Sequence, residues 1–266
     1  MTTTLTPQDG CTVVTGGASG IGLVTARLLL ADGARKVALM DLNEPAHDVL
    51  EELRRRYGPE RVQVLTCNVS QRDEVHAAVA AVGKDVPVSG VVSCAGTVMA
   101  KPSLDLTLDD LHKLFDVHLA GSLFTAQAAA IAWIASDTAG AIVNTSSVAA
   151  NFGWPGRLPY PVAKAGIEAL TRTLAVEWAR WGIRVNAVSP GSVDSPLMAD
   201  GKRPPGIKPL SEVADRHALG RVAQPQEVAE AITFLLSAKS SFITGAVLAV
   251  DGGFTITKDS AKELAQ

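Results

Sequence analysis

The sequence predicts an α/β fold with a doubly wound, mainly parallel, seven-stranded sheet that carries helices on both faces. Two observations support this prediction: short β-branched runs alternate with longer amphipathic segments, and a glycine-rich turn follows the first run. Strands that alternate with helices form βαβ units, whose right-handed crossovers keep the sheet parallel and buried. The 266 residues show no repeat and no clear linker, so we expect a single domain over 1–266.

Each strand is expected from a short apolar run that is rich in β-branched residues. In chain order these runs are 11–16, 36–41, 61–67, 88–94, 140–146, 183–189 and 246–252. Helices are expected where apolar residues recur with helical spacing, at 21–33, 44–58, 72–83, 108–136 and 161–182. Three of these helical segments end in a glycine, which is a common C-terminal cap: Gly58, Gly83 and Gly182.

The composition, 47% hydrophobic and 19% charged, is typical of a soluble globular protein. A formal net charge of −3 argues against electrostatic binding of nucleic acid or anionic lipid. The cysteines Cys11, Cys67 and Cys94 are widely spaced and odd in number, so we expect neither a disulfide nor a metal site. The N-terminus lacks a secretory apolar stretch, and the longest apolar run, 128–135, is too short to span a bilayer. We therefore expect a cytoplasmic protein without a nucleic-acid or membrane partner.

One segment differs from its surroundings in composition. Residues 195–210 are rich in proline and glycine and directly follow a predicted strand. A long loop at such a place in a compact domain often serves as a lid. We expect a substrate lid at about 195–215, and a passive surface connection is the alternative.

A run of small residues, TGGASGIG at 15–22, joins the first strand to the first helix. Glycines let the backbone approach a ligand, and the helix N-terminus then directs N–H groups at a pyrophosphate. Asp41 ends the second strand, 19 residues beyond Gly22, where an acid would bind the adenosine ribose of NAD. The same carboxylate would repel the 2′-phosphate of NADP by on the order of 1 kcal/mol or more. No Arg or Lys stands at Ser19 or Leu42 to offset that repulsion, so the sequence favours NAD over NADP.

Tyr160 stands four residues before Lys164 in the stretch RLPYPVAKAG, so the two side chains share one face of a helix. A free phenol has a pKa near 10, and that pKa must fall by about three units before the phenol can act as a base at neutral pH. A neighbouring ammonium favours the phenolate and lowers the phenol pKa. The alternative is an ordinary tyrosine that packs on the sheet.

The glycine turn, Ser147 placed 13 residues before Tyr160, the Tyr-x-x-x-Lys pair and the later Pro190–Gly191 together resemble the short-chain dehydrogenase/reductase family. The resemblance extends over essentially the whole chain. It implies a Rossmann-like fold, a nicotinamide dinucleotide cofactor and a catalytic group of Ser147, Tyr160 and Lys164. In such a group the tyrosine exchanges a proton with the substrate, the serine binds the substrate oxygen, and the lysine also binds the nicotinamide ribose.

The resemblance also implies which residues contact the cofactor. The glycine turn would bind the phosphates, the segment after the third strand the adenine, and the segment after the sixth strand the nicotinamide amide. Together with Asp41, the assigned residues are Thr15, Gly16, Ser19, Gly20, Ile21, Gly22, Asn68, Val69, Ala95, Gly96, Tyr160, Lys164, Pro190, Gly191, Val193 and Ser195.

The substrate pocket is expected to lie between the residues that follow Ser147 and the lid. Its expected walls are aromatic and aliphatic, which suits a hydrophobic or mixed substrate. The alternative is that the two aromatic residues of this set belong to the core or to an interface. The set is Ala149, Phe152, Trp154, Leu158 and Met198.

Several positions depart from the family's usual pattern. Ser93 and Cys94 replace two asparagines whose contacts between strands must be made in another way, and Asn68 stands where Asp is more common. His118 stands at a kink of the long helix, where the family has an Asn that positions a water beside the lysine. His118 is therefore either a packed histidine that preserves the kink or a catalytic proton carrier.

The sequence thus predicts an NAD-dependent oxidoreductase that interconverts a small secondary alcohol and a ketone by hydride transfer. Two alternatives stay open: reduction of a 3-oxoacyl thioester, and a dinucleotide-sensing module without turnover. The long helices at about 107–135 and 159–181 are apolar over much of their length. The family resemblance implies that they pack against copies of the chain in a dimer or homotetramer.

Overall fold

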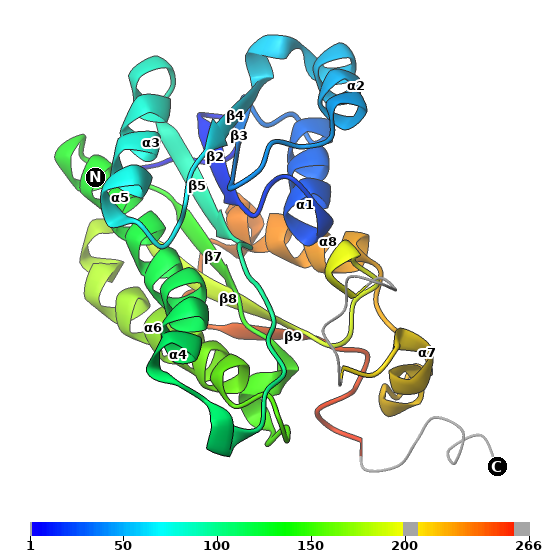
Figure 1. Ribbon diagram of the computed structural model, residues 1–266. Helices are drawn as coiled ribbons and strands as arrows, with labels where there is room; N and C mark the ends of the chain where they lie inside the picture. The colour runs from blue at the N-terminus through cyan, green and yellow to red at the C-terminus, as the bar shows by residue number, and fades with distance from the viewer. Residues whose placement is uncertain (1, 199–206, 258–266) are drawn as a thin grey trace.

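The computed structural model describes residues 2–198 and 207–257. Within these residues the main sheet has seven strands, all paired in parallel, in the order β4-β3-β2-β5-β7-β8-β9 (Figure 1). The strands are β2 (Cys11–Thr15), β3 (Lys36–Asp41), β4 (Val62–Thr66), β5 (Val88–Ser93), β7 (Ala141–Thr145), β8 (Arg184–Pro190) and β9 (Val247–Val250). Each of the seven predicted runs overlaps one of them, which confirms the predicted fold class.

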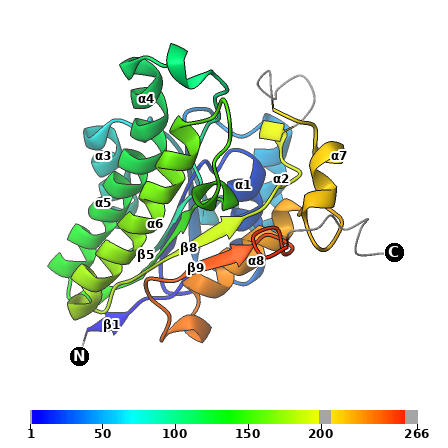
Figure 2. The same cartoon turned by 90° about the horizontal axis from the view of Figure 1, so that it is seen from below.

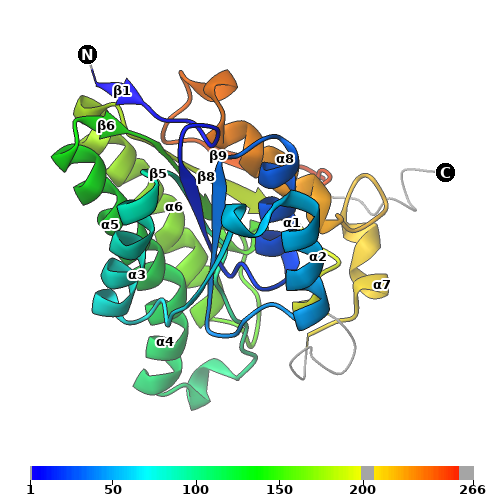
Figure 3. The ribbon, with the colours of Figure 1, turned by 90° about the horizontal axis from the view of Figure 1, so that it is seen from above.

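Helices cover both faces of the sheet, as Figures 2 and 3 show from two opposite sides. They are α1 (Gly20–Ala31), α2 (His47–Tyr57), α3 (Arg72–Asp85), α4 (Leu108–Phe115), α5 (Gly121–Ala135), α6 (Pro159–Trp178), the short α7 (Leu210–Val213) and α8 (Pro225–Leu236). Helices α1, α2 and α8 pack on one face, and α3, α5 and α6 pack on the other. A separate two-stranded pairing joins β1 (Thr3–Thr4) to β6 (Thr138–Ala139).

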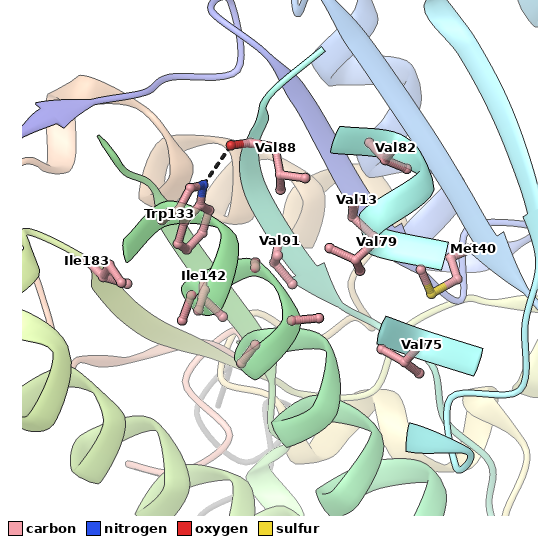
Figure 4. Close-up of a cluster of buried hydrophobic side chains, with 14 of the residues drawn as sticks. Val13, Met40, Val75, Val79, Val82, Val88, Val91, Trp133, Ile142 and Ile183 are labelled. Carbon is pink, nitrogen blue, oxygen red and sulfur yellow. Dashed lines mark hydrogen bonds between the residues drawn. The ribbon is translucent and has the colours of Figure 1, made fainter. Parts of the chain in front are cut away.

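Two buried apolar clusters, one on each face, hold the layers together. The alternation within β2 separates them, because Val13 faces α3 and α5 whereas Val14 faces α1 and α8. In the cluster of Figure 4, the Trp133 indole N–H donates to the carbonyl of Val88 at 2.6 Å. A Cβ at Gly140 would lie 2.3 Å from the Trp133 ring, so glycine is required there. The same contacts hold α5 against the first residue of β5, at the edge of the sheet opposite to the carboxyl ends of the strands.

The order of the strands places the site. From β2 the chain continues outward through β3 and β4, and then returns to add β5, β7, β8 and β9 on the other side of β2. In open parallel sheets a ligand binds where the order reverses, outside the carboxyl ends of the strands. Here that point lies between the ends of β2 and β5.

The predicted helix 108–136 is interrupted where the family resemblance implied a kink, because a π-helical turn at Asp116–Ala120, which contains His118, separates α4 from α5. Helix α8 was not predicted, although Pro225 at its first turn and a capping box between Gln224 and Glu227 mark its start.

Two further segments bear on predictions made from the sequence. The stretch Leu108–Ala135 has the length and composition of a membrane span. Half of its most apolar 18-residue segment is buried inside the protein, and a core helix of a soluble protein meets the same criteria, so this stretch is weak evidence for a span. The predicted lid at 195–215 lies partly outside the described residues. Its described parts are a turn at Pro196–Met198, α7, and a turn at Ala214–Arg216.

Candidate active site

Two adjoining cavities occupy the carboxyl ends of the strands in the described part of the chain. One, of about 740 Å³, runs along the glycine turn and Asp41, and we call it the turn cavity. The other, of about 420 Å³, contains Tyr160, and we call it the tyrosine cavity. They share lining residues that include Cys94 and Gly96, so a long ligand can extend from one into the other.

The glycine turn has a backbone that other residues would not fit. Gly16 and Gly20 have φ values of +65° and +54°. A Cβ at Gly16 would lie 2.8 Å from the backbone of Ala95, and a Cβ at Gly22 would lie 2.3 Å from the carbonyl oxygen of Gly16. The side chain of Ser19, the N-cap of α1, makes no capping hydrogen bond, so the first N–H groups of α1 can bind an anion. The residues present therefore fit a dinucleotide phosphate.

Most of the residues assigned to the cofactor line one of the two cavities. Those at the turn cavity are Gly16, Ser19, Gly20, Ile21, Gly22, Asp41, Asn68, Val69, Ala95, Gly96 and Ser195. Those at the tyrosine cavity are Ile21, Gly96, Tyr160, Lys164, Pro190, Gly191, Val193 and Ser195. Thr15 lines neither cavity. Its hydroxyl oxygen instead accepts hydrogen bonds from the backbone N–H groups of Cys94 and Ala95, each at 3.2 Å, and so positions the segment that does line them.

Two polar side chains of the turn cavity are already partly engaged. The Asn68 side-chain oxygen accepts from the backbone and hydroxyl of Ser70, at 3.1 and 2.8 Å, which leaves its amide N–H groups for a ligand. The Asp41 carboxylate accepts from the N–H of Ala18 at 3.1 Å, which fixes it beside the glycine turn. An ionised group held there recognises hydroxyl donors and repels phosphate.

The three predicted catalytic side chains meet in the tyrosine cavity. Ser147 follows β7, and Tyr160 and Lys164 come from the first turns of α6. The Lys164 ammonium donates to the carbonyl of Thr145 at 2.7 Å and lies 5.6 Å from the centre of the Tyr160 ring. Lys164 thus holds helix α6 against the end of β7.

Burial dominates the proton affinities of this group. It raises the pKa of the Tyr160 phenol above its usual value, and a hydrogen bond with Ser147 and the charge of Arg157 only partly oppose the rise. Burial also lowers the pKa of the Lys164 ammonium to about 8. The neighbours that oppose the rise in the phenol pKa are therefore Ser147 and Arg157. The expected contribution of Lys164, which lies 5.6 Å from the centre of the Tyr160 ring, stays a prediction.

His118 lies in the π-helical turn and points into the same cavity, where its ring meets the Tyr160 ring edge to face at 5.5 Å. Its Nε2 lies 2.7 Å from the carbonyl oxygen and 3.2 Å from the N–H of Thr97. Its Nδ1 is buried and has no hydrogen-bond partner among the described residues. Burial, and then the charge of Lys164, lower the pKa of His118 to about 3, so the ring is neutral at physiological pH.

The positions that replace the usual asparagines make a different connection between strands. The Cys94 thiol lies 3.2 Å from the Thr145 hydroxyl, which links the ends of β5 and β7. The Ser93 hydroxyl is buried and makes no hydrogen bond within the described residues. One of the two replacements therefore restores a contact between strands through its own side chain.

Comparison with known proteins assigns the family. A family model described as enoyl-(acyl carrier protein) reductase matches residues 16–255. The chain is also 41% identical over 245 residues to the cis-4-hydroxycyclohexanecarboxylate dehydrogenase of Sinomonas cyclohexanicum, with 91% of this chain and 95% of that protein covered. The chain belongs to the short-chain dehydrogenase/reductase family.

Other short-chain dehydrogenases/reductases are similar over the same length. The 2,5-dichloro-2,5-cyclohexadiene-1,4-diol dehydrogenase of Sphingobium indicum is 35% identical, covering 91% of this chain and 96% of that protein. A 3-oxoacyl-(acyl-carrier-protein) reductase of Thermotoga maritima is 34% identical, covering 92% and 97%. The solved aldohexose dehydrogenase of Thermoplasma acidophilum superposes with a TM-score of 0.81 at 29% identity, covering 94% and 95%. The protein is thus an oxidoreductase that acts on CH–OH groups and uses a nicotinamide dinucleotide.

The predicted substrate pocket of this short-chain dehydrogenase/reductase is only partly assembled. Trp154 and Met198 line the tyrosine cavity. Ala149, Phe152 and Leu158 do not: Ala149 is fully buried, the Phe152 ring packs against Phe254, and Leu158 is 46% exposed. The side chains of the short turn after Ser147 point in different directions, which spacing in the sequence does not reveal.

Two arginines of the cavity were missed from the sequence, Arg157 and Arg216. Arg157 stands three residues before Tyr160, so its position one turn away was a usable signal. No signal in the sequence connects Arg216 to the site, because it reaches the cavity only through the fold. Thr97 and Thr145 were also missed, and both act through backbone carbonyls.

Proposed function

We propose that the protein is an NAD-dependent dehydrogenase that oxidises a secondary alcohol on a non-aromatic carbon ring, with Tyr160 as the general base. One observation carries the proposal: Ser147, Tyr160 and Lys164 converge in a cavity that adjoins a glycine-turn cavity containing Asp41. The ring alcohol is suggested by the names of the relatives from Sinomonas and Sphingobium.

Asp41 is the basis for preferring NAD over NADP. Its carboxylate lines the turn cavity, beside the glycine turn. Lys113 is the only cationic side chain among the described residues that line this cavity, and it comes from α4 rather than from the turn or the end of β3. A ribose diol can donate to the Asp41 carboxylate, whereas a 2′-phosphate would meet a like charge.

Each catalytic side chain has a separate role in the proposed reaction. When bound, the oxidised nicotinamide takes up the hydride and brings positive charge into the cavity. Tyr160 accepts the proton of the substrate hydroxyl, and Ser147 donates a hydrogen bond to the same oxygen. Since burial raises the pKa of Tyr160, the phenolate needs every nearby positive charge, including Arg157. Lys164, near Tyr160 and with a pKa of about 8, contributes while it is protonated.

His118 is proposed as a positioning residue rather than as a proton carrier. A carrier exchanges protons near its working pH, and the pKa of His118 is lowered to about 3. Its contacts with Thr97 and Tyr160 instead fix the loop after β5 and the ring of the base.

Reduction of a 3-oxoacyl thioester is the second candidate, since a relative from Thermotoga carries that name. The third is a dinucleotide sensor without turnover.

The free thiols Cys11, Cys67 and Cys94 support a reducing compartment, and with it the proposed location in the cytoplasm.

Initial rates with a panel of substrates test the proposal. The purified protein is given NAD⁺ or NADP⁺ with cyclopentanol, cyclohexanol and linear secondary alcohols, and in reverse NADH or NADPH with acetoacetyl-CoA. We expect NADH formation with ring alcohols, and a kcat/KM for NAD⁺ that exceeds that for NADP⁺ by about tenfold or more. Faster reduction of acetoacetyl-CoA by NADPH would support the second candidate. Cofactor binding without any turnover would support the third.

A further inference from the structure

Two arginines face the tyrosine cavity, and none of the residues that line it is Asp or Glu in the described chain. Arg157 is half-buried just before the start of α6, and Arg216 is exposed on the turn after α7. Lys208 also lines the cavity, but it pairs with Glu212 at 3.6 Å. Apart from the catalytic Lys164, the positive charges left open to the cavity are therefore the two guanidinium groups.

These arginines differ from most others in the protein. No side-chain hydrogen bond or ion pair of Arg157 or Arg216 is found within residues 2–198 and 207–257. Elsewhere arginines have carboxylate partners, as in the pairs of Arg27 with Glu52 and of Arg221 with Glu227, or donate to carbonyls, as Arg184 does. A guanidinium carries five N–H donors in a fork that matches a carboxylate. Two such forks facing one cavity leave many donors for an anionic ligand.

Arg157 is held in place for this task. Its guanidinium stacks over the Trp154 ring, with 4.7 Å from the guanidinium carbon to the ring centre. Its backbone carbonyl accepts from the N–H of Tyr160 at 3.0 Å, which ties it to the catalytic helix. Burial lowers the pKa of Arg157, the charge of Tyr160 opposes this change, and the charge of Arg216 lowers the pKa further, so the two guanidinium groups lie close enough to repel each other. An anion between them would relieve that repulsion.

The anion belongs to the substrate rather than to the cofactor. The glycine turn and the uncapped N-terminus of α1, which would bind the pyrophosphate, line the turn cavity, and no arginine lines that cavity in the described chain. The arginines line the part of the site that contains the catalytic side chains. A thioester of coenzyme A is a poorer match, because its phosphates lie at the far end of the pantetheine arm, whereas Arg157 lies one turn from Tyr160.

We propose that the substrate carries a carboxylate besides the reacting hydroxyl, and that Arg157, supported by Arg216, binds this carboxylate while Tyr160 takes the hydroxyl proton. This inference rests on the proposed function and narrows its substrate class to hydroxylated ring carboxylic acids. The stacked guanidinium fixes the acid, so the carbinol carbon is presented to the cofactor in one orientation.

The test compares an acid with its amide, which has nearly the same shape but no charge. Initial rates are measured at saturating NAD⁺ with 3- and 4-hydroxycyclohexanecarboxylates, the corresponding carboxamides, and cyclohexanol. We expect kcat/KM for at least one acid to exceed that of its amide by about tenfold or more. The difference should come mainly from a lower KM for the acid, because charge-assisted hydrogen bonds to its carboxylate strengthen binding. Added salt should lower the rate with the acid more than the rate with the amide.

Variants then show which residues cause the preference for the acid over the amide. Arg157→Met should lower the ratio of acid to amide kcat/KM by about tenfold to a hundredfold, and Arg157→Lys and Arg216→Met should lower it less. Arg180→Met is the matched control, because Arg180 also stacks on an indole, that of Trp181 at 3.9 Å, but does not line the cavity. That variant should keep both the ratio and the rates of the wild type.

The outcomes separate this inference from the proposed function. Equal rates with acid and amide, or a loss with Arg157→Met that is the same for both, would overturn the carboxylate site while ring-alcohol oxidation stands. If no alcohol is oxidised, the proposed function fails, but the binding of an acid and its amide can still test the carboxylate site. Calorimetry with NADH and cyclohexanecarboxylate, against cyclohexanecarboxamide, should then show that only the acid binds, and only while Arg157 is present. Equal or absent binding of the two would refute the inference.

Discussion

The ammonium of Lys164 is buried in the folded protein, which is energetically unfavourable for a charged group. The Lys164 side chain is 5% exposed, and burial lowers its pKa from the usual 10.5 to about 8. The hydrogen bond to the carbonyl of Thr145 compensates only part of the lost hydration. Residues at functional sites are often strained in this way, because their role requires a position that stability alone would not select.

The pH dependence of stability should reveal this cost. Between pH 8 and about 10.4 the unfolded chain keeps the Lys164 proton while the folded protein has released it, so stability rises with pH in that range. Relative to Lys164→Met, the wild type should gain about 2 kcal/mol on going from pH 7.5 to 10. Urea unfolding of both proteins measures this gain, with the exposed Lys239→Met as a control for general effects of pH. A difference that does not change with pH would contradict the assigned burial.

At the scale of elements, the strand ends determine the site. The glycine turn after β2, Asp41 as the last residue of β3 and Ser147 after β7 were predictable from the sequence, because the ends of parallel strands meet at one edge of a sheet. The family resemblance implied the kink at His118, but the sequence did not reveal that the kink is a π-helical turn. Nor did it reveal the meeting of Arg157 and Arg216, which brings together segments far apart in the chain.

The π-helical turn leads to a prediction about His118. Because the pKa of His118 is lowered to about 3, its ring is not protonated at neutral pH and does not relay protons to the site. His118→Asn should therefore change kcat by less than about threefold. The pH profile of kcat should keep its shape. A fall of a hundredfold or a lost limb of the profile would instead identify His118 as a proton carrier.

At the scale of the whole molecule, apolar side chains on the outer surface indicate further assembly. Helices α5 and α6 lie side by side in the helical layer (Figures 1 and 2), and Ile131 on α5 and Val162 and Val176 on α6 are 56%, 49% and 82% exposed. Exposed apolar groups on neighbouring helices often mark an interface. We propose that this surface packs against a second copy of the chain.

Light scattering coupled to size-exclusion chromatography tests the assembly. The wild type should elute as a dimer or tetramer, and Val176→Asp should shift it toward a smaller species, because a buried, unpaired carboxylate is costly at an interface. Val176→Thr, with almost the same shape, should leave the assembly largely intact. A monomeric wild type would rule out the proposed interface.

The most direct test of the account is the turnover of Tyr160→Phe. This variant keeps the ring that contacts His118 but removes the oxygen that accepts the substrate proton. With a ring alcohol that the wild type oxidises, kcat for NADH formation should fall by about a hundredfold to ten-thousandfold, while the affinity for NAD⁺ changes by less than about threefold. Turnover comparable to that of the wild type would show that another group takes the proton, and would contradict the assigned role of Tyr160.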